Sequence, residues 1–88
     1  MQAKLDLYKV FKEVADSGNI SVAAKNMYIS QSAVSQSIKS LEDSLKVKLF
    51  SRSKRGVTLT KDGQTLYEYV SAGISLIESG EEKLGESK

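Results

Sequence analysis

The connection between two predicted helices constrains this chain more than any other feature of its sequence. The earlier helix has Ser21 as a good N-cap and ends near Tyr28, and the later helix has Ser30 as its N-cap. The later segment then carries an apolar stripe at spacings of four, three and four residues: Val34, Ile38, Leu41 and Leu45. Only Ile29 and Ser30 separate the two helices, so the sequence predicts a sharp corner between them.

Another amphipathic helix precedes this pair. Apolar side chains recur at helical spacing from Leu5 to Ala15, and charged side chains occupy the other faces, which predicts a helix over about 4–16. Gly18 and Asn19 end it, because both residue types tolerate the left-handed conformation found at helix ends. No Pro occurs in the 88 residues, which favours helices over a turn-rich β domain.

The periodicity changes after this helical part of the chain. Residues 49–52 and 57–60 are short runs with β-branched or aromatic members, and Gly56 lies in the basic segment between them. This pattern predicts a two-stranded hairpin over about 49–59 with Gly in its turn. Thr60 can then cap a final helix, where Asp62 suits the positive end of the helix dipole.

The composition excludes several classes of function. The chain is long enough for one small domain, and it has no Cys and no His. Disulfides, thiolate or imidazole metal sites and Ser-His-Asp catalysis are therefore absent. We expect neither an enzyme nor a bound cofactor or metal. No apolar run approaches the ~20 residues of a spanning helix, and residues 1–6 show no signal-peptide pattern. We therefore expect a cytoplasmic protein that does not contact a membrane.

The charges are divided unevenly along the chain. Residues 1–60 contain ten Lys or Arg and five Asp or Glu, whereas residues 61–88 contain three and six. No acid occurs from Ser17 to Leu41 or from Ser44 to Thr60. A basic segment followed by an acidic one suggests that one face of the molecule binds a polyanion and that the following helix does not.

The order of these elements is the layout of a winged helix-turn-helix. We therefore predict a mainly α fold with three helices and a two-stranded wing over residues 1–60, in which the helix-turn-helix occupies about 20–39. A long linker helix, suited to dimerisation, follows over residues 61–88. The aromatic residues Tyr8, Phe11 and Phe50 are expected in the core, and Tyr28 is also expected to pack there rather than contact nucleic acid.

The outward face of the third helix fits the major groove of duplex DNA, because it lacks acids and is rich in short polar groups. Its first turn also presents backbone N–H groups that favour a phosphate oxygen. The cations of the hairpin are placed to reach phosphates or a minor groove. The candidate DNA-binding residues are Ser21, Lys25, Gln31, Ser32, Ser35, Gln36, Lys39, Arg52, Lys54 and Arg55. Glu42 and Asp43 are interpreted as ending this face electrostatically.

Each of these signals also has a plainer explanation. A polar helix face is commonly just solvated, cations in a turn commonly serve solubility, and Lys25 could simply cover its own helix. An alternative function is a helical protein-interaction module built on the last helix, but that alternative leaves the capped, acid-free third helix unexplained. Single-stranded or RNA binding is disfavoured because no exposed row of aromatic residues is available for stacking.

The last helix carries a heptad-like seam on one face. Its members are the candidate dimerisation residues Leu66, Val70, Gly73, Ile77, Gly80 and Leu84. The two glycines on the seam either let paired helices approach closely or act as local weak points, since each interior Gly costs about 0.5–1 kcal/mol relative to Ala. Gly63 and Gly85 add to this expected weakness of an isolated helix.

Three segments together resemble the amino-terminal domain of LysR-type bacterial transcription regulators. They are the run from Ser21 to Glu42, the tetrapeptide from Leu49 to Arg52, and the segment from Leu59 to Gly63. The resemblance spans about residues 3–70, and the stretch Ser-Gln-Ser-Ala-Val-Ser at 30–35 is its most specific part. It implies a winged helix-turn-helix followed by a long linker helix that pairs two chains.

The resemblance also implies where contacts with DNA lie. Gln31, Ser32, Ser35 and Gln36 approach base edges and phosphates, and Arg52 approaches the minor groove or the backbone. Many family members have Pro in place of Ser32 or Arg in place of Gln36, so the docking is implied but the base preference is not.

The implied partner is double-stranded DNA with an interrupted inverted repeat, bound by a homodimer whose two-fold symmetry the repeat mirrors. Such a regulator acts in the bacterial cytoplasm on the nucleoid. Family members continue into an effector-sensing domain well beyond residue 88, so we expect that domain, and with it a small-molecule ligand, to be absent from this chain.

Overall fold

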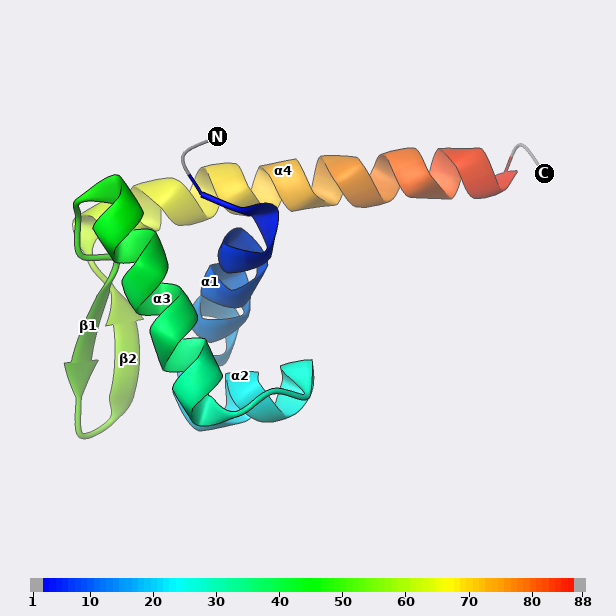
Figure 1. Cartoon of the computed structure of the whole chain (residues 1–88). Helices are drawn as coiled ribbons and strands as arrows, with labels where there is room; N and C mark the ends of the chain where they lie inside the picture. Colours follow the sequence, from blue (N-terminus) through cyan, green and yellow to red (C-terminus); the bar gives the residue numbers. More distant parts are fainter. Residues whose placement is uncertain (1–2, 87–88) are drawn as a thin grey trace.

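The computed structural model describes residues 3–86 and contains the elements α1, α2, α3, β1, β2 and α4 in that order (Figure 1). Their bounds are Leu5–Ser17 for α1, Ile20–Met27 for α2, Gln31–Leu45 for α3, Phe50–Ser53 for β1, Gly56–Leu59 for β2 and Lys61–Glu86 for α4. The predicted mainly α fold with a winged helix-turn-helix is confirmed. We call α1, α2, α3 and the β1–β2 wing the body of the molecule. The end of the predicted last helix, residues 87–88, lies outside the described residues.

One apolar core joins the three helices of the body to the wing. Phe11 and Val14 of α1 are fully buried, as are Val34 and Leu41 of α3 and Leu49 before β1. The rings of Phe11 and Phe50 lie 5.4 Å apart at an angle of 50°, a favourable tilted arrangement. The predicted core positions of these two aromatic residues are confirmed, and half-buried Tyr8 packs against the same core.

The corner between α2 and α3 forms largely as its residues predict. The Ser30 hydroxyl accepts a hydrogen bond from the backbone N–H of Ala33 at 3.1 Å, which confirms the predicted cap of α3. The predicted cap of α2 is wrong by two residues. Asn19, rather than Ser21, has the extended backbone of an N-cap, and its side-chain oxygen accepts from Val22 N–H at 3.0 Å.

Tyr28 is exposed, which contradicts the expectation that it packs in the core. Its φ of 59° places it in the left-handed conformation that ends α2, and its N–H donates to the carbonyls of Ala24 and Lys25. A residue that closes a helix in this way sits on the outside of the turn, and 95% of Tyr28 is accessible to solvent.

The wing is tied at its turn to the end of α1. Strands β1 and β2 are antiparallel, with Phe50 opposite Leu59 and Ser53 opposite Gly56. Gly56 has a φ of 122°, and a Cβ there would lie 2.5 Å from the carbonyl oxygen of Gly18. That oxygen accepts a hydrogen bond from Val57 N–H at 3.2 Å, so the Gly in the predicted hairpin turn also permits this close approach.

The start of α4 packs directly on the backbone before β1. The carbonyl oxygen of Leu49 accepts from Thr60 N–H at 2.9 Å. The Thr60 hydroxyl accepts from Gly63 N–H at 3.0 Å, which confirms the predicted cap, and donates to the Lys48 carbonyl at 2.6 Å. Gly63 is buried, and a Cβ there would lie 2.1 Å from the Leu49 oxygen. We call Leu49, Thr60 and Gly63 the wing junction.

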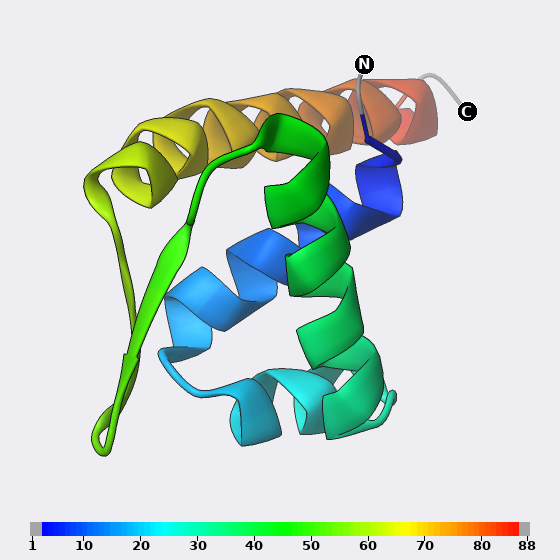
Figure 2. The same ribbon diagram turned by 60° about the vertical axis from the view of Figure 1, so that its left-hand side comes forward.

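Beyond this junction, α4 crosses one side of the body and continues as a free arm (Figures 1 and 2). Leu66, Tyr67 and Val70 pack against the core, whereas residues 75–86 are exposed throughout. Neither α4 nor any other described helix has the length and hydrophobicity needed to cross a membrane.

Replacing Gly63 by Ala is expected to lower the free energy of unfolding by about 1–3 kcal/mol, because the added methyl group would overlap a backbone oxygen. The control is Gly85→Ala, whose Cβ would have no neighbour within 4 Å. That change should leave stability unaltered or raise it by up to about 1 kcal/mol through helix propensity. Urea denaturation measures both variants, and equal stabilities would contradict the close approach at Gly63.

Candidate nucleic-acid interface

The two sides of α3 differ sharply in chemistry. Val34, Ile38 and Leu41 are buried, so the helical repeat turns the intervening polar side chains outward. Gln31, Ser32, Gln36 and Lys39 are exposed, and Ser35 is half-buried beside them. The first turn of α3 contains no acid, which leaves the positive end of its dipole uncompensated.

A hydrogen bond between two of the predicted site residues braces the corner between α2 and α3. The amide nitrogen of Gln31 donates to the Ser21 hydroxyl at 3.2 Å. Within α3, the Gln36 amide donates to the Ser40 hydroxyl at the long distance of 3.5 Å. Lys25 is exposed on α2, and within residues 3–86 it forms no ion pair. The structure therefore joins Ser21 to Gln31 and leaves Lys25 separate from them.

The wing presents three exposed cations, Arg52, Lys54 and Arg55. None of them forms an ion pair with a carboxylate of the described chain. One groove between α3 and β1 brings the two predicted groups of site residues together. Its lining residues are Ile38, Lys39, Glu42, Lys48, Phe50 and Arg52. Lys48 is a cation of this surface that sequence reasoning missed.

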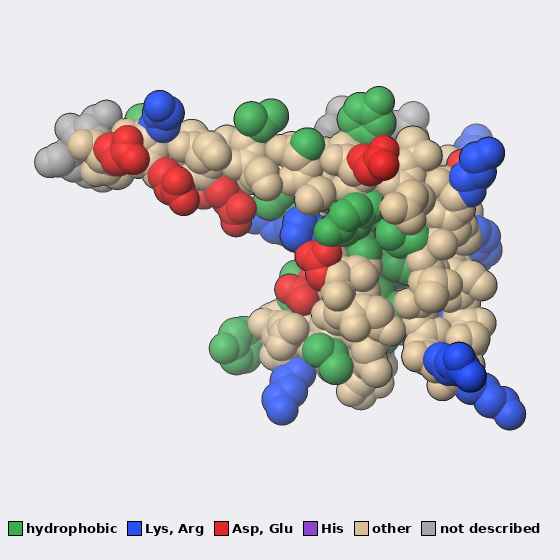
Figure 3. All heavy atoms as spheres, turned by 180° about the vertical axis from the view of Figure 1, so that it is seen from behind, with side chains coloured by type: hydrophobic (Ala, Val, Ile, Leu, Met, Phe, Trp, Pro, Cys, Tyr) green, Lys and Arg blue, Asp and Glu red, His purple; other side chains and the backbone are tan. Residues whose placement is uncertain are grey.

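The polar end of α3 and the tip of the wing both lie on the side of the body away from α4 (Figures 1 and 2). In the view from behind, basic side chains mark the wing end of the body, and acidic side chains follow the free arm of α4 (Figure 3). The uneven distribution of charge along the sequence is thus a separation in space.

Glu42 holds the start of the wing against α3, a role its sequence position does not show. Its Oε2 accepts from Leu49 N–H at 2.7 Å and from Phe50 N–H at 3.3 Å, and its side chain is only 11% exposed. Its other oxygen lies 3.8 Å from Lys48 Nζ. Glu42 therefore has a structural role in addition to the one expected, and the interpretation that Glu42 and Asp43 end the α3 face electrostatically stays a prediction.

Four of the six predicted dimerisation residues line one apolar groove between α1 and α4. The groove is formed by Leu5, Tyr8, Leu66, Tyr69, Val70, Gly73, Ile74 and Ile77. Gly80 and Leu84 do not line this groove and lie farther along the exposed arm. A Cβ at Gly73 or Gly80 would have no neighbour within 4 Å, so the role of these glycines in pairing stays a prediction.

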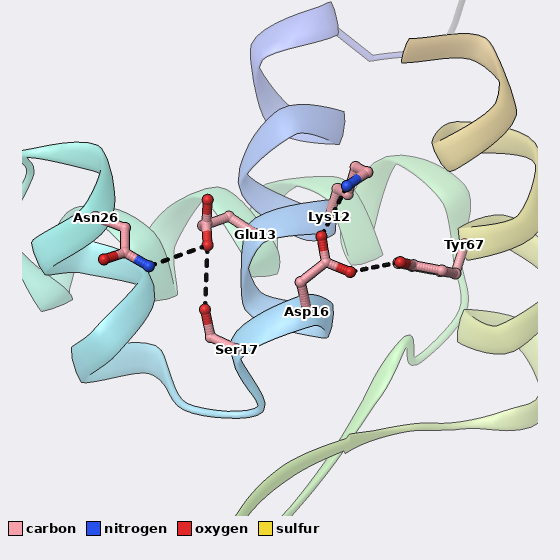
Figure 4. A network of polar contacts seen from close by, with 6 residues as sticks. All are labelled: Lys12, Glu13, Asp16, Ser17, Asn26 and Tyr67. Carbon is pink, nitrogen blue, oxygen red and sulfur yellow. Dashed lines mark hydrogen bonds and ion pairs between the residues drawn. The ribbon is translucent and has the colours of Figure 1, made fainter. Parts of the chain in front are cut away.

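Two carboxylates of α1 connect it to its neighbours (Figure 4). Glu13 accepts hydrogen bonds from the Ser17 hydroxyl at 3.1 Å and from the Asn26 amide of α2 at 3.3 Å. Asp16 accepts from Lys12 Nζ at 2.7 Å and from the hydroxyl of Tyr67 in α4. These contacts thus link α1 to α2 and to α4 and are not part of the α3 face.

The Asp16 carboxylate raises the pKa of both of its hydrogen-bond partners. The hydrogen bond to Asp16 is the main cause that raises the pKa of Lys12 above its ordinary 10.5. The same carboxylate raises the pKa of Tyr67 above 10.0. Partial burial raises the pKa of Asp16, but the hydrogen bonds from Lys12 and Tyr67 together outweigh it and lower that pKa below 3.8. Near neutral pH, Lys12 and Asp16 are therefore charged and Tyr67 keeps its proton, so the hydrogen bonds of this network can all form. The described residues hold no cluster of three carboxylates that could bind a metal ion.

The fold and this surface define a winged helix-turn-helix protein. Its α3, the second helix of the helix-turn-helix motif, exposes a polar face. Residues 5–64 match the sequence model of the family described as "Bacterial regulatory helix-turn-helix protein, lysR family". The chain belongs to this family.

Two similar proteins are themselves transcriptional regulators rather than enzymes. The chain is 38% identical over 79 residues to HTH-type transcriptional regulator PerR of Escherichia coli, matching 90% of this chain and 27% of PerR. It is 41% identical over 83 residues to HTH-type transcriptional regulator GltR of Bacillus subtilis, matching 94% of this chain and 28% of GltR. The chain therefore spans little more than a quarter of the length of these relatives.

A solved structure described as the CbnR_DBD–DNA complex has the same fold. It superposes with a TM-score of 0.84 at 31% sequence identity, covering 98% of this chain and all of that one.

Replacing Glu42 by Ala is expected to destabilise the protein by about 1–3 kcal/mol, because two largely buried N–H groups lose their acceptor. The neighbouring Asp43→Ala is the control, since its exposed carboxylate only approaches Lys39 at 3.7 Å and should matter by less than about 1 kcal/mol. Unfolding in urea and hydrogen exchange at Leu49 and Phe50 measure the effect. Unchanged protection of these two amides in Glu42→Ala would refute the assigned role.

Proposed function

We propose that this chain is the DNA-binding part of a LysR-type transcription regulator and that it binds double-stranded DNA sequence-selectively as a dimer. Residues 1–60 form the DNA-binding domain in this proposal, and residues 61–88 form the linker helix. The observation that carries the proposal is the juxtaposition of an acid-free polar face on α3 with unpaired wing cations on the same side of the body.

The proposed docking places α3 in the major groove, which is wide enough to admit a helix. Gln36 and Ser32 then face base edges, and the free N–H groups of the first turn of α3 face a phosphate. Lys39 and Arg52 line one groove, so the duplex backbone beside α3 meets cations from two elements at once. The DNA complex of CbnR, a protein of the same fold, supports this placement.

The proposed dimer forms through α4. Leu76, Ile77 and Leu84 are exposed on the arm, and the groove between α1 and α4 adds apolar surface next to them. A helix that leaves such side chains in water gains stability by covering them with a second copy. Two-fold symmetry then requires two half-sites in an interrupted inverted repeat. Such a dimer would act on the nucleoid in the bacterial cytoplasm.

A protein-interaction module without DNA binding is the weaker alternative. It uses the apolar face of α4 but leaves unexplained why the polar face of α3 from Gln31 to Lys39 lacks acids and lies beside the wing cations. A mobility-shift experiment on duplex DNA at moderate salt distinguishes the two functions, because only the proposed function produces a shifted complex.

Gln36→Ala is expected to reduce discrimination between a selected operator and random duplex DNA by about 1–3 kcal/mol, because a base-edge contact is lost. The operator is obtained by selecting bound sites from random duplex DNA. The control is Gln64→Ala, an exposed glutamine on α4 that lies outside the proposed interface. Fluorescence anisotropy titrations measure both affinities. Unaltered selectivity of Gln36→Ala would show that another residue distinguishes the bases.

Arg52→Ala and Arg55→Ala are expected to weaken binding to all sequences, because each removes a cation that neutralises phosphate. Each lost phosphate contact should reduce the slope of log K against log salt by about 0.9. Lys4→Ala, which removes an exposed cation before α1, provides the control and should leave the slope unchanged. A salt slope in the two arginine variants equal to that of the unmodified protein would remove the wing from the interface.

A further inference from the structure

The direction of α4 relative to the body is fixed at two successive turns of that helix. The first point is the wing junction, where Gly63 lies against the carbonyl oxygen of Leu49. The second point comes four residues later, where the hydroxyl of Tyr67 donates to Asp16 of α1 (Figure 4). If α4 were attached to the body at one point, it could rotate about that point, whereas attachment at two points fixes its direction.

The apolar contacts around these points do not replace the hydrogen bond between Tyr67 and Asp16. Leu66 and Val70 pack against the core, but apolar packing is non-directional and tolerates small rotations of a helix. The hydrogen bond depends on distance and angle, and it holds a specific pair of atoms together. Lys12 donates to the other oxygen of Asp16 at 2.7 Å and so holds the carboxylate in place toward Tyr67.

A small change in this direction has a large effect at the proposed DNA surface. The molecule measures 48 × 26 × 19 Å, and the tip of the wing lies on the side away from α4. Lys54 at the tip is five residues beyond Leu49, or ~16 Å along an extended strand, so a rotation of about 12° about the junction moves the tip by ~3.4 Å, the spacing of successive base pairs. In a dimer paired through α4, such a change in the angle of α4 would alter the distance between the two DNA-binding surfaces by about one base pair.

We propose that the hydrogen bond between Tyr67 and Asp16 locks α4 to the body and thereby selects the spacing between the half-sites of the operator. The second part of this inference rests on the proposed function, since it requires a dimer that binds duplex DNA. The lock itself is a property of one chain and is tested without DNA.

The test of the lock uses two spin labels within one chain. Because the sequence contains no Cys, the double substitution Lys54→Cys and Glu81→Cys places one label at the wing and one on the arm of α4. Measurements are made with labelled chains diluted into an excess of unlabelled chains, so that only distances within one chain contribute. Tyr67→Phe removes the hydroxyl and keeps the ring. Its distance distribution should be clearly broader than that of the parent, whereas a distribution of unchanged width would overturn the lock.

Thr65→Val is the matched control, because Thr65 is two residues away on the same helix and its hydroxyl donates within α4, to the carbonyl of Lys61 at 3.3 Å. It should retain the narrow distribution of the parent. Asp16→Asn supplies a second variant, since it keeps an oxygen acceptor for Tyr67 but loses the charge that holds Lys12. Its distribution should fall between those of the parent and Tyr67→Phe. Equal broadening in Thr65→Val would also overturn the assignment to the Tyr67 hydroxyl.

The test of spacing uses the selected operator with one base pair added or removed between its half-sites. One base pair shifts a half-site by ~3.4 Å and turns it by about 35°, so the unmodified protein should bind each altered site roughly tenfold more weakly. Tyr67→Phe should reduce this loss to about threefold or less, while Thr65→Val keeps it. A full tenfold loss in Tyr67→Phe would overturn the spacing inference, and so would an unmodified protein that is indifferent to spacing. Absence of any operator binding by the unmodified protein would instead refute the proposed function, and the label distances would still decide the lock.

Discussion

The backbone of Leu49 is in contact with three parts of this structure: α3, the end of the hairpin and α4. Its N–H donates to Glu42 at the end of α3, and its carbonyl oxygen accepts from Thr60 at the end of the hairpin. The same oxygen lies against the Cα of Gly63 in the first turn of α4. One peptide segment thus joins α3, the wing and α4. Because these contacts converge on one residue, the start of α4 is attached directly to the base of the wing.

The proposed DNA-binding surface is positioned by what is buried beneath it. Burial of Val34 and Ile38 turns Gln36 and Lys39 toward solvent, since positions two and one residue away fall on other faces of a helix. The contact between the rings of Phe11 and Phe50 fixes β1, which brings Arg52 to the same groove as Lys39. Gln36 donates only a long hydrogen bond within α3, and Lys39 approaches Asp43 only to 3.7 Å, which leaves both side chains available to a ligand.

Features set by local sequence could be predicted, whereas features set by the meeting of distant segments could not. The Ser30 cap, the apolar stripe of α3 and the hairpin with Gly56 follow from short-range patterns and are present. The cap of α2 was misplaced because Ser21 and Asn19 are both good caps and only the backbone distinguishes them. The role of Glu42 depends on where residues seven and eight positions later return to α3. The contact of Tyr67 with α1 joins residues 51 positions apart, which no local pattern encodes.

The net charge of +2 is the sum of a basic body and an acidic arm, which lie in different parts of the molecule. Exposed charges interact weakly beyond the Debye length of ~8–10 Å at physiological salt. The free arm of α4 carries Glu78, Glu81, Glu82 and Glu86, and it lies on the side of the molecule away from the tip of the wing (Figure 1). These acids therefore do not oppose a polyanion bound at the wing. They lie on the same arm as the exposed Leu76, Ile77 and Leu84. In the proposed dimer, two arms side by side in the same direction would bring like charges together, which would favour pairing in which the acidic half of one α4 lies beside the less acidic half of the other.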